Sequence, residues 1–196
     1  MMVVLAFIAM ACSRTDIVDT WMRPDYQPAS PAKVLVVGIA ERAEARDAFE
    51  AEVVRALSER GYNAEPGGAV LPAKAHRMKR PELKGMVRGM GFDGALVMAL
   101  VDRVDLPRNP PGGYTAQTFG SLYTNYPTTF GEVQGTVPDD TKTIYVLEAR
   151  YYDLEETGVV WRTQTETKEP KNIPSFAREF ANRIVRRLAK DRIISK

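Results

Sequence analysis

Few residues of this chain could carry out chemistry, and those few stand apart from one another. The sequence contains one cysteine, Cys12, and one histidine, His76. A lone cysteine forms no disulfide within the chain, and one Cys with one His cannot supply a four-ligand zinc site. His76 lies in a basic polar stretch typical of an exposed loop or helix start, and no G-x-S-x-G motif supplies a nucleophile. We therefore expect no metal, no cofactor and no nucleophilic catalysis.

Residues 89–94 (GMGFDG) satisfy the G-x-G-x-x-G pattern of dinucleotide-binding folds. In those folds the glycines follow a strand and open a helix, whose N-terminus then meets phosphate. Here they end a predicted helix and precede a predicted strand, which is the reverse order. We expect Gly91 to close the helix and Gly94 to allow a tight entry into the strand.

A basic stretch lies between residues 73 and 80. Such a cluster could contact anionic lipid or a polyanionic cell-wall polymer, and the alternative is an ordinary solvated charged face. The cations that could make this contact are Lys74, Arg77, Lys79 and Arg80.

A long segment at residues 107–140 is rich in Pro, Gly, Thr and aromatic residues. Loops of this length are uncommon in compact domains and are often functional. Rigid aromatic rings between small polar residues make adaptable contact surfaces. We expect either a partner-binding loop or an extra hairpin or flap without a dedicated partner. The contact residues would be Tyr114, Phe119, Tyr123, Tyr126 and Phe130.

Length and composition indicate one soluble globular domain with terminal extensions. The chain has 196 residues, of which 44% are hydrophobic and 27% charged. Its formal net charge of +2 is too small to favour nucleic acid as a partner.

The N-terminus has the pattern of a signal peptide. Residues 1–11 form an almost unbroken apolar run, too short to span a bilayer as a helix. Residues 8–12 (IAMAC) resemble the lipobox of bacterial lipoproteins, with Ala9 where that family usually has Leu. The resemblance implies cleavage before Cys12, acylation of Cys12, and sorting to the outer membrane, because Ser13 rather than Asp follows. The alternative is a buried thiol in an N-terminal strand or helix.

Residues 12–32 predict a spacer between this anchor and the folded domain. We find no helical or strand period in residues 13–32, and three prolines favour a semi-stiff extended chain. Trp21 and Tyr26 would dock on the domain or lie at the membrane interface. The domain itself is expected at residues 33–196.

The domain shows the pattern of an α/β fold close to the α+β border. Apolar runs at residues 33–39 and 95–101 predict buried strands, and residues between them predict helices ending at Gly61 and Gly91. Residues 142–152 and 159–167 alternate like a half-exposed hairpin, and Pro174 opens a last amphipathic helix. We expect a mixed sheet of about 4–6 strands with about three main helices: a βαβαβ core, an antiparallel hairpin and a C-terminal helix.

This order of elements over residues 21–192, with the KVLVVGI, GFDGALVMALV and VVWR segments, resembles a widespread group of uncharacterised bacterial lipoproteins. It is also similar to the N-terminal domain of the Tol–Pal periplasmic protein. The curli-secretion lipoprotein and the lipoprotein activators of penicillin-binding proteins share such a domain. The resemblance implies a protein that binds other envelope components and is not an enzyme.

We therefore expect a lipid-anchored, non-enzymatic periplasmic protein whose partner is an envelope protein or a cell-wall polymer, in a cell envelope location. One alternative is an envelope subunit that assembles into a homo-oligomer. Another is a hydrolase that uses carboxylates alone, which needs two carboxylates facing across a cleft. Asp139 and Asp140 could be half of such a site, but Pro138 and these residues predict a turn.

Overall fold

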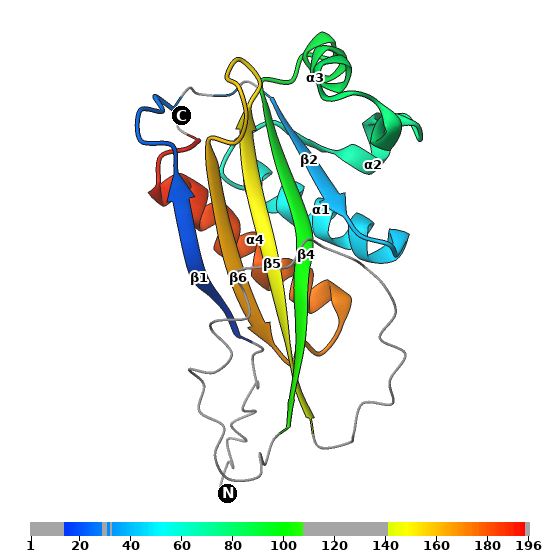
Figure 1. Cartoon of the computed structure of the whole chain (residues 1–196), viewed down its shortest axis with the longest axis vertical. Coiled ribbons are helices and arrows are strands. Elements are labelled where there is room, and N and C mark those ends of the chain that lie inside the picture. Colours follow the sequence, from blue (N-terminus) through cyan, green and yellow to red (C-terminus); the bar gives the residue numbers. More distant parts are fainter. Residues whose placement is uncertain (1–13, 29–30, 32, 108–140, 195–196) are drawn as a thin grey trace, which may run out of the picture.

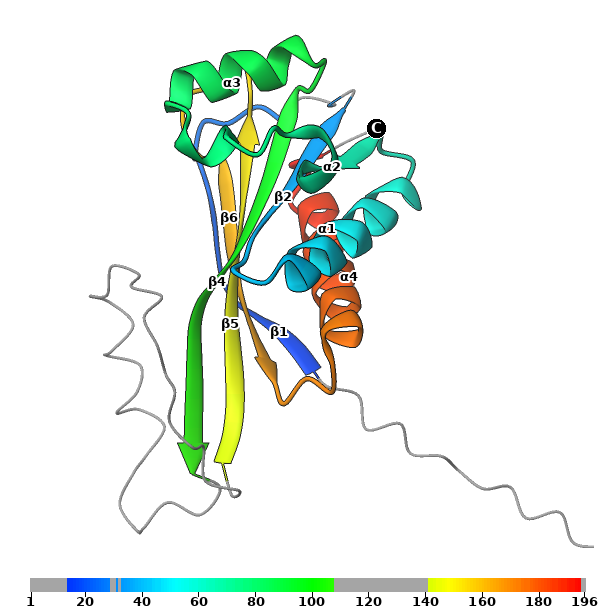
Figure 2. The same cartoon turned by 90° about the vertical axis from the view of Figure 1, so that its right-hand side faces the viewer.

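The computed structural model describes residues 14–28, 31, 33–107 and 141–194, and these form one six-stranded sheet in the order β1-β6-β5-β4-β2-β3 (Figure 1). Helices α1 and α4 cover one face, and α3 lies across one end of the other face (Figure 2). The strands are β1 Arg14–Met22, β2 Val34–Ile39, β3 Ala64–Pro66, β4 Gly94–Pro107, β5 Thr141–Asp153 and β6 Trp161–Lys168. The helices are α1 Ala43–Ser58, α2 Gly67–Val70, α3 Arg80–Gly89 and α4 Ile173–Lys190, with a 3-10 turn at Ala75–Arg77.

The βαβαβ core is confirmed. Strand β2 lies between β3 and β4 and pairs parallel with both. Parallel strands need crossover connections, which α1 supplies on one side and the α2–α3 region on the other. The glycines predicted to end helices do so, because Gly61 and Gly91 have φ values of 78° and 82°, in the region that favours glycine.

The predicted hairpin and last helix are also confirmed. Strands β5 and β6 pair antiparallel from Tyr151↔Trp161 to Ile144↔Lys168. The alternation of β6 sends one set of side chains beneath α4 and leaves the other set on the opposite face. The buried set consists of threonines at positions 163, 165 and 167, which have no solvent exposure.

A spacer without secondary structure at residues 13–32 is wrong for residues 14–22. These residues form β1, an edge strand that pairs antiparallel with β6 from Arg14↔Lys168 to Met22↔Trp161. Buried threonine hydroxyls join the two strands, with 2.8 Å between Thr15 Oγ1 and Thr167 Oγ1. The folded body therefore includes residues 14–22 and is not confined to residues 33–196.

The alternating pattern of β1 is hidden in the sequence by a bulge. The register shifts between Ile17 and Asp19, so Val18 has no partner in the β6 ladder. A bulge reverses the phase of the two-residue period, and neither half of the strand is long enough to show a pattern alone. Beyond the strand, Tyr26 docks on the domain, where its hydroxyl donates to Asp153 Oδ2 at 3.0 Å. Trp21 stays 40% exposed.

The main core lies between the sheet and the α1–α4 pair. Trp161 and Phe180 are its largest fully buried side chains, and Trp161 Nε1 donates to Asp191 Oδ2 at 2.9 Å. A buried carboxylate, Glu50 on α1, accepts the backbone N–H of Gly38 at 2.9 Å and of Gly68 at 2.8 Å. Glu50 thereby joins α1 to the end of β2 and the start of α2.

Strands β4 and β5 continue past the other strands as a short two-stranded ribbon, residues 105–107 and 141–143. Pairing of β4 with β2 ends at Ile39↔Ala99, whereas pairing with β5 continues to Pro107↔Thr141. β4 is thus longer than the predicted strand at 95–101. The aromatic segment that connects β4 to β5 falls at residues 108–140, outside the described residues.

Candidate functional site on the open face of the sheet

One face of the sheet is covered only in part. Helix α3 and its neighbours bury a small cluster around Leu35, Ala95 and Leu154 at one end. Farther along the same face no helix of the described residues covers β1, β6, β5 and β4 (Figures 1 and 2). We call this surface the open face, and its residues are Asp19, Val97, Ala99, Glu148, Arg150, Arg162 and Gln164.

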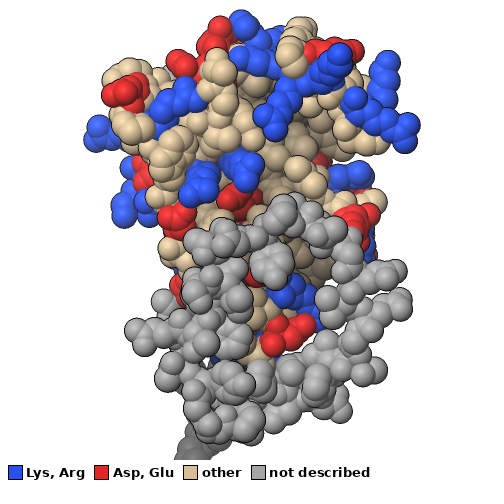
Figure 3. All heavy atoms as spheres, viewed as in Figure 1, with Lys and Arg blue, Asp and Glu red and all other residues tan. Residues whose placement is uncertain are grey.

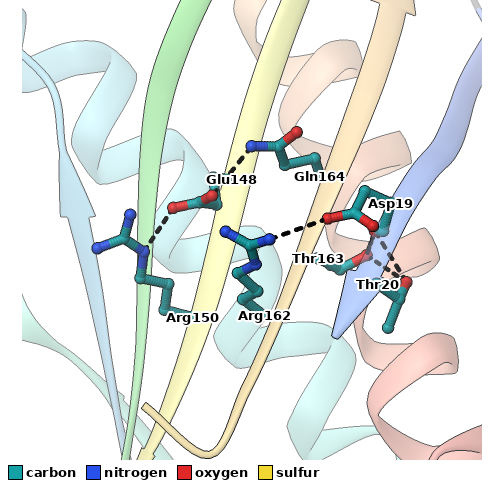
Figure 4. A network of polar contacts seen from close by, with 7 residues as sticks. All are labelled: Asp19, Thr20, Glu148, Arg150, Arg162, Thr163 and Gln164. Carbon is teal, nitrogen blue, oxygen red and sulfur yellow. Dashed lines mark hydrogen bonds and ion pairs between the residues drawn. The ribbon is translucent and has the colours of Figure 1, made fainter. Parts of the chain in front are cut away.

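A polar network crosses the open face from β5 to β1 (Figure 4). The carboxylate of Glu148, whose side chain is only 6% exposed, accepts from Arg150 Nε and from Gln164 Nε2, the latter at 3.0 Å. On the next two strands, Arg162 Nη2 lies 3.4 Å from Asp19 Oδ2. Each guanidinium therefore has one carboxylate partner on the sheet, and the side chains of Arg150 and Arg162 are 48% and 44% exposed.

The two arginines are direct neighbours across strands, because Arg150 pairs with Arg162 in the β5–β6 register. Like charges placed opposite each other destabilise a sheet, and the two carboxylates offset this repulsion. Burial works against the charged form of Arg150, but the charge of Glu148 and its hydrogen bond outweigh it and raise the pKa of Arg150. Two adjacent, permanently charged guanidiniums can bind a carboxylate or phosphate with several donors.

Apolar side chains continue the open face beside the arginines. Val97 lies opposite Arg150 and Ala99 opposite Glu148 in the β4–β5 register. Both are half-buried, so each offers part of its surface to a partner. Arginines beside aliphatic side chains are common in protein–protein interfaces.

A pocket of about 380 Å³ lies on the opposite face, where α1 and α4 begin. Its wall includes an aromatic group in which Phe49 meets Phe176 edge-on at 5.1 Å between ring centroids, with Tyr145 5.6 Å from Phe176. The lining contains Arg42 and Arg46 but neither Asp nor Glu. The pocket therefore lacks the pair of carboxylates that a glycan-cleaving site needs.

The predicted basic cluster is brought together at the opposite end of the molecule from the ribbon. Lys74, Arg77, Lys79 and Arg80 are all exposed around the 3-10 turn and the start of α3. Figure 3 shows lysines and arginines over this end of the molecule. None of the four forms an ion pair with a described residue, and Arg77 Nε donates to Nε2 of the exposed His76 at 3.1 Å. The structure is thus compatible with either the contact surface or the solvated face.

The glycine pattern at residues 89–94 has the predicted structural role. Gly91 follows α3, and Gly94 opens β4, where an added Cβ would collide with the hydroxyl oxygen of Tyr151 and lie 2.7 Å from its Cζ. Only glycine fits there, and the order helix–glycines–strand excludes the phosphate cradle of a dinucleotide fold.

Several predicted site residues lie outside the described residues, so the structure leaves them as predictions. These are Cys12, the aromatic residues Tyr114, Phe119, Tyr123, Tyr126 and Phe130, and the pair Asp139 and Asp140. Within the described ranges, no group of three or more His, Cys, Asp or Glu side chains could hold a metal ion. In the same ranges, no helix is long and apolar enough to cross a membrane.

Sequence reasoning missed the network on the open face. Glu148 and Arg150 are two residues apart in one predicted strand, and Arg162 and Gln164 are two apart in the next. That spacing places each pair on one face of its strand. The pairing of Arg150 with Arg162 depends on the register of the hairpin, which a seven-residue connection does not fix.

The fold defines a class: a mixed six-stranded α/β sheet with two helices on one face and a largely open second face. No known protein-family model matches the sequence. No curated protein matches it either.

Among solved structures, the chain is similar to the PelC dodecamer from Paraburkholderia phytofirmans, with 15% identity, a TM-score of 0.47, and coverage of 88% of this chain and 95% of PelC. A single-substitution form of that dodecamer gives 10% identity with the same TM-score and coverage. Lipoprotein GNA1162 from Neisseria meningitidis gives 17% identity and a TM-score of 0.45, over 81% of this chain and 99% of that one. The expected relation to the Tol–Pal periplasmic protein domain stays a prediction.

Proposed function

We propose that this chain is a non-enzymatic protein of the bacterial cell envelope, anchored to the outer membrane through acylated Cys12 and facing the periplasm. In this proposal it binds another envelope component with the open face of its sheet. The observation that carries the proposal is the pair of neighbouring arginines, Arg150 and Arg162, on a sheet face that no described helix covers. Exposed paired guanidiniums beside aliphatic side chains favour recognition of a surface.

Binding without catalysis fits the chemistry of the open face. The carboxylate of Glu148 is occupied by Arg150 and Gln164, and Asp19 is occupied by Arg162. A general acid or base needs a carboxyl group that can exchange a proton with substrate, and both carboxylates here are held by donors. The envelope partner would present carboxylates toward the arginines and an apolar strip toward Val97 and Ala99. A protein surface supplies both, whereas a cell-wall polymer supplies mainly the carboxylates.

The test is crosslinking in intact cells that produce the full chain, followed by purification and mass spectrometry of the crosslinked partner. Arg150→Ala combined with Arg162→Ala should remove the partner that the native chain captures. The matched control is Arg42→Ala with Arg178→Ala, which removes two exposed arginines, one just before α1 and one on α4, on the other side of the sheet. Capture that survives the first pair of changes, in a variant with a native melting temperature, would refute a role for the open face.

A second candidate function, self-assembly, is favoured by the exposed residues of the edge strand. Val18, Trp21 and Met22 on β1 are 50%, 40% and 41% exposed, although large apolar side chains are mostly buried elsewhere in the described residues. An edge strand also presents unpaired backbone N–H and C=O groups that can pair with another chain. In this alternative, the occupant of the β1 edge is a second copy of the chain.

Light scattering after size-exclusion chromatography distinguishes the two candidates. An oligomer that dissociates in Val18→Lys with Trp21→Glu, but not in Ile39→Glu at the exposed end of β2, would support assembly through β1. A monomer at every accessible concentration would remove this candidate and leave the first unaffected.

A further inference from the structure

The position of β1 bears on how the body sits at the membrane, given the lipid anchor of the proposed function. Only Ser13 separates Cys12 from Arg14, the first residue of β1. Each residue extends the chain by at most about 3.6 Å, so the anchor lies within about 7 Å of the start of β1. The membrane surface must therefore be close to the end of the sheet at which β1 begins.

The sheet register shows which residues share that end. Arg14 lies opposite Lys168 at the end of β6, and Lys168 lies opposite Ile144 near the start of β5. Two residues before Ile144 on β5, Lys142 lies opposite Leu106 near the tip of the ribbon. Lys171 follows Lys168 by three residues, in the turn between the end of β6 and the start of α4, and so belongs to the same end.

Three lysines without a described ion-pair partner lie at this end. Lys168 and Lys171 are exposed and Lys142 is half-buried, and none of the three forms an ion pair with a described residue. Glu169 lies among them, and Glu166 and Asp16 lie opposite each other two residues from the Lys168↔Arg14 pair. Asp105 at the ribbon is engaged by Arg103 and by the hydroxyl of Thr143. Each lysine near an anionic bilayer contributes attraction to the headgroups, and its aliphatic stem can cover apolar surface.

Half-buried apolar side chains accompany these lysines near the tip of the ribbon. Val104 and Leu106 on β4 and Ile144 on β5 are all partly exposed there. Lysines over a strip of aliphatic side chains match the boundary between phosphate headgroups and acyl chains. We propose that this end, defined by Lys142, Lys168, Lys171 and the ribbon tip, rests on the anionic phospholipid surface that holds the anchor.

The basic cluster near α3 lies too far from the anchor to share that surface. α3 is tied to the turn between β5 and β6, since Lys84 Nζ donates to the Glu156 carbonyl at 2.8 Å and Arg88 pairs with Glu155. That turn lies at the opposite end of β1, whose nine residues span about 26 Å at about 3.3 Å per step. At physiological salt the Debye length is about 8 Å, so the anchoring membrane does not attract Lys74 or Lys79.

Chemical footprinting of lysines on the mature, full-length lipoprotein tests the proposal without mutation. The protein is reconstituted in vesicles of phosphatidylcholine alone or with phosphatidylglycerol, treated with an amine-acetylating reagent, and analysed by mass spectrometry. Acetylation of Lys142, Lys168 and Lys171 should fall several-fold when phosphatidylglycerol is present, and Lys74 and Lys79 should not change. The protection should fade in 1 M salt, where the Debye length is about 3 Å.

Equal labelling of both ends, or protection of Lys74 and Lys79 instead, would overturn the proposal. Protection that is the same with phosphatidylcholine alone would overturn the role of anionic headgroups. The mass of the N-terminal peptide shows in the same sample whether Cys12 is acylated. The experiment therefore distinguishes a missing lipid anchor from a missing contact between the lysines and the lipid surface. If Cys12 were unmodified, the unanchored protein could be mixed with phosphatidylglycerol vesicles and acetylated in the same way. That experiment would test by itself whether Lys142, Lys168 and Lys171 contact the lipid surface.

Discussion

Glu50 provides the sharpest stability test of this structure. Its side chain is 1% exposed, and its two carboxylate oxygens accept from the backbone N–H groups of Gly38 and Gly68. In Glu50→Ala both donors lose their partner in a site that has little access to water. A hydrogen bond to a charged group contributes about 1.5–3 kcal/mol, so the two bonds together correspond to about 3–6 kcal/mol.

Glu50→Gln should be intermediate in stability. The amide oxygen can accept from one backbone N–H, but the amide NH2 then faces the other N–H, and two donors cannot bond to each other. The unfolding free energy should therefore be highest for the native chain, lower for Glu50→Gln and lowest for Glu50→Ala. For a domain of this size, a loss of about 4 kcal/mol lowers the melting temperature by about 12 °C.

Urea unfolding monitored by circular dichroism measures these differences. Glu44→Ala is the matched control, because it removes a carboxylate from the exposed surface of the same helix and should change the stability by less than about 0.5 kcal/mol. The explanation would be refuted if Glu50→Ala unfolded within about 1 kcal/mol of the native protein.

Three further predictions concern packing, pH and the edge strand. Gly94→Ala should destabilise the fold by more than about 2 kcal/mol. Adding Tyr151→Phe should restore only part of the lost stability, since the ring carbon Cζ would still lie 2.7 Å from the new Cβ. Thermal melts of the single and double variants check this. Burial raises the pKa of Tyr151, so the folded state keeps the proton longer than the unfolded state. Stability is therefore unaffected below the unfolded pKa of about 10 and falls by about 1.4 kcal/mol per pH unit above it. Denaturant unfolding between neutral and alkaline pH should show a smaller loss of stability in Tyr151→Phe than in the native chain. Identical alkaline profiles of the two proteins would contradict the assignment of this loss to Tyr151. Thr15→Val or Thr167→Val alone should lower the free energy of unfolding by about 1–3 kcal/mol, because each leaves one buried hydroxyl unpaired. The double change should lower it by less than the sum of the two single changes. Additive losses in urea unfolding would argue that β1 does not pair with β6.

The sequence predicts best those elements whose signal is local. The first residues of the apolar runs of β2 and β4 are buried on both faces, and Gly61 and Gly91 take positive φ values at the ends of helices, so composition and spacing are sufficient there. β1 escapes the same reasoning because its bulge at Val18 interrupts the alternation. Its prolines follow the strand instead of interrupting it, and they mask a strand that ends two residues before Pro24.

The candidate site could be predicted only in part, because it is made by neighbours across strands. The alternation places Glu148 and Arg150 on one face of β5, and Arg162 on one face of β6. Which of the two faces lacks a helix depends on how α1, α3 and α4 pack, and no single strand carries that information. The threonine side of β6 illustrates the difficulty, since Thr163 and Thr165 are fully buried while Arg162 is exposed.

The pairing of β1 with β6 also has a consequence for the order in which the chain can fold. The hydroxyls of Thr15 and Thr167 are separated by 152 positions, so β1 cannot pair with β6 until nearly the whole chain has been synthesised. Contacts this distant in sequence close late, because the entropy of the intervening chain opposes them. In the proposed lipoprotein, Cys12 would thus be acylated before β1 joins the sheet. The later pairing of β1 with β6 would then bring the folded body to its anchor.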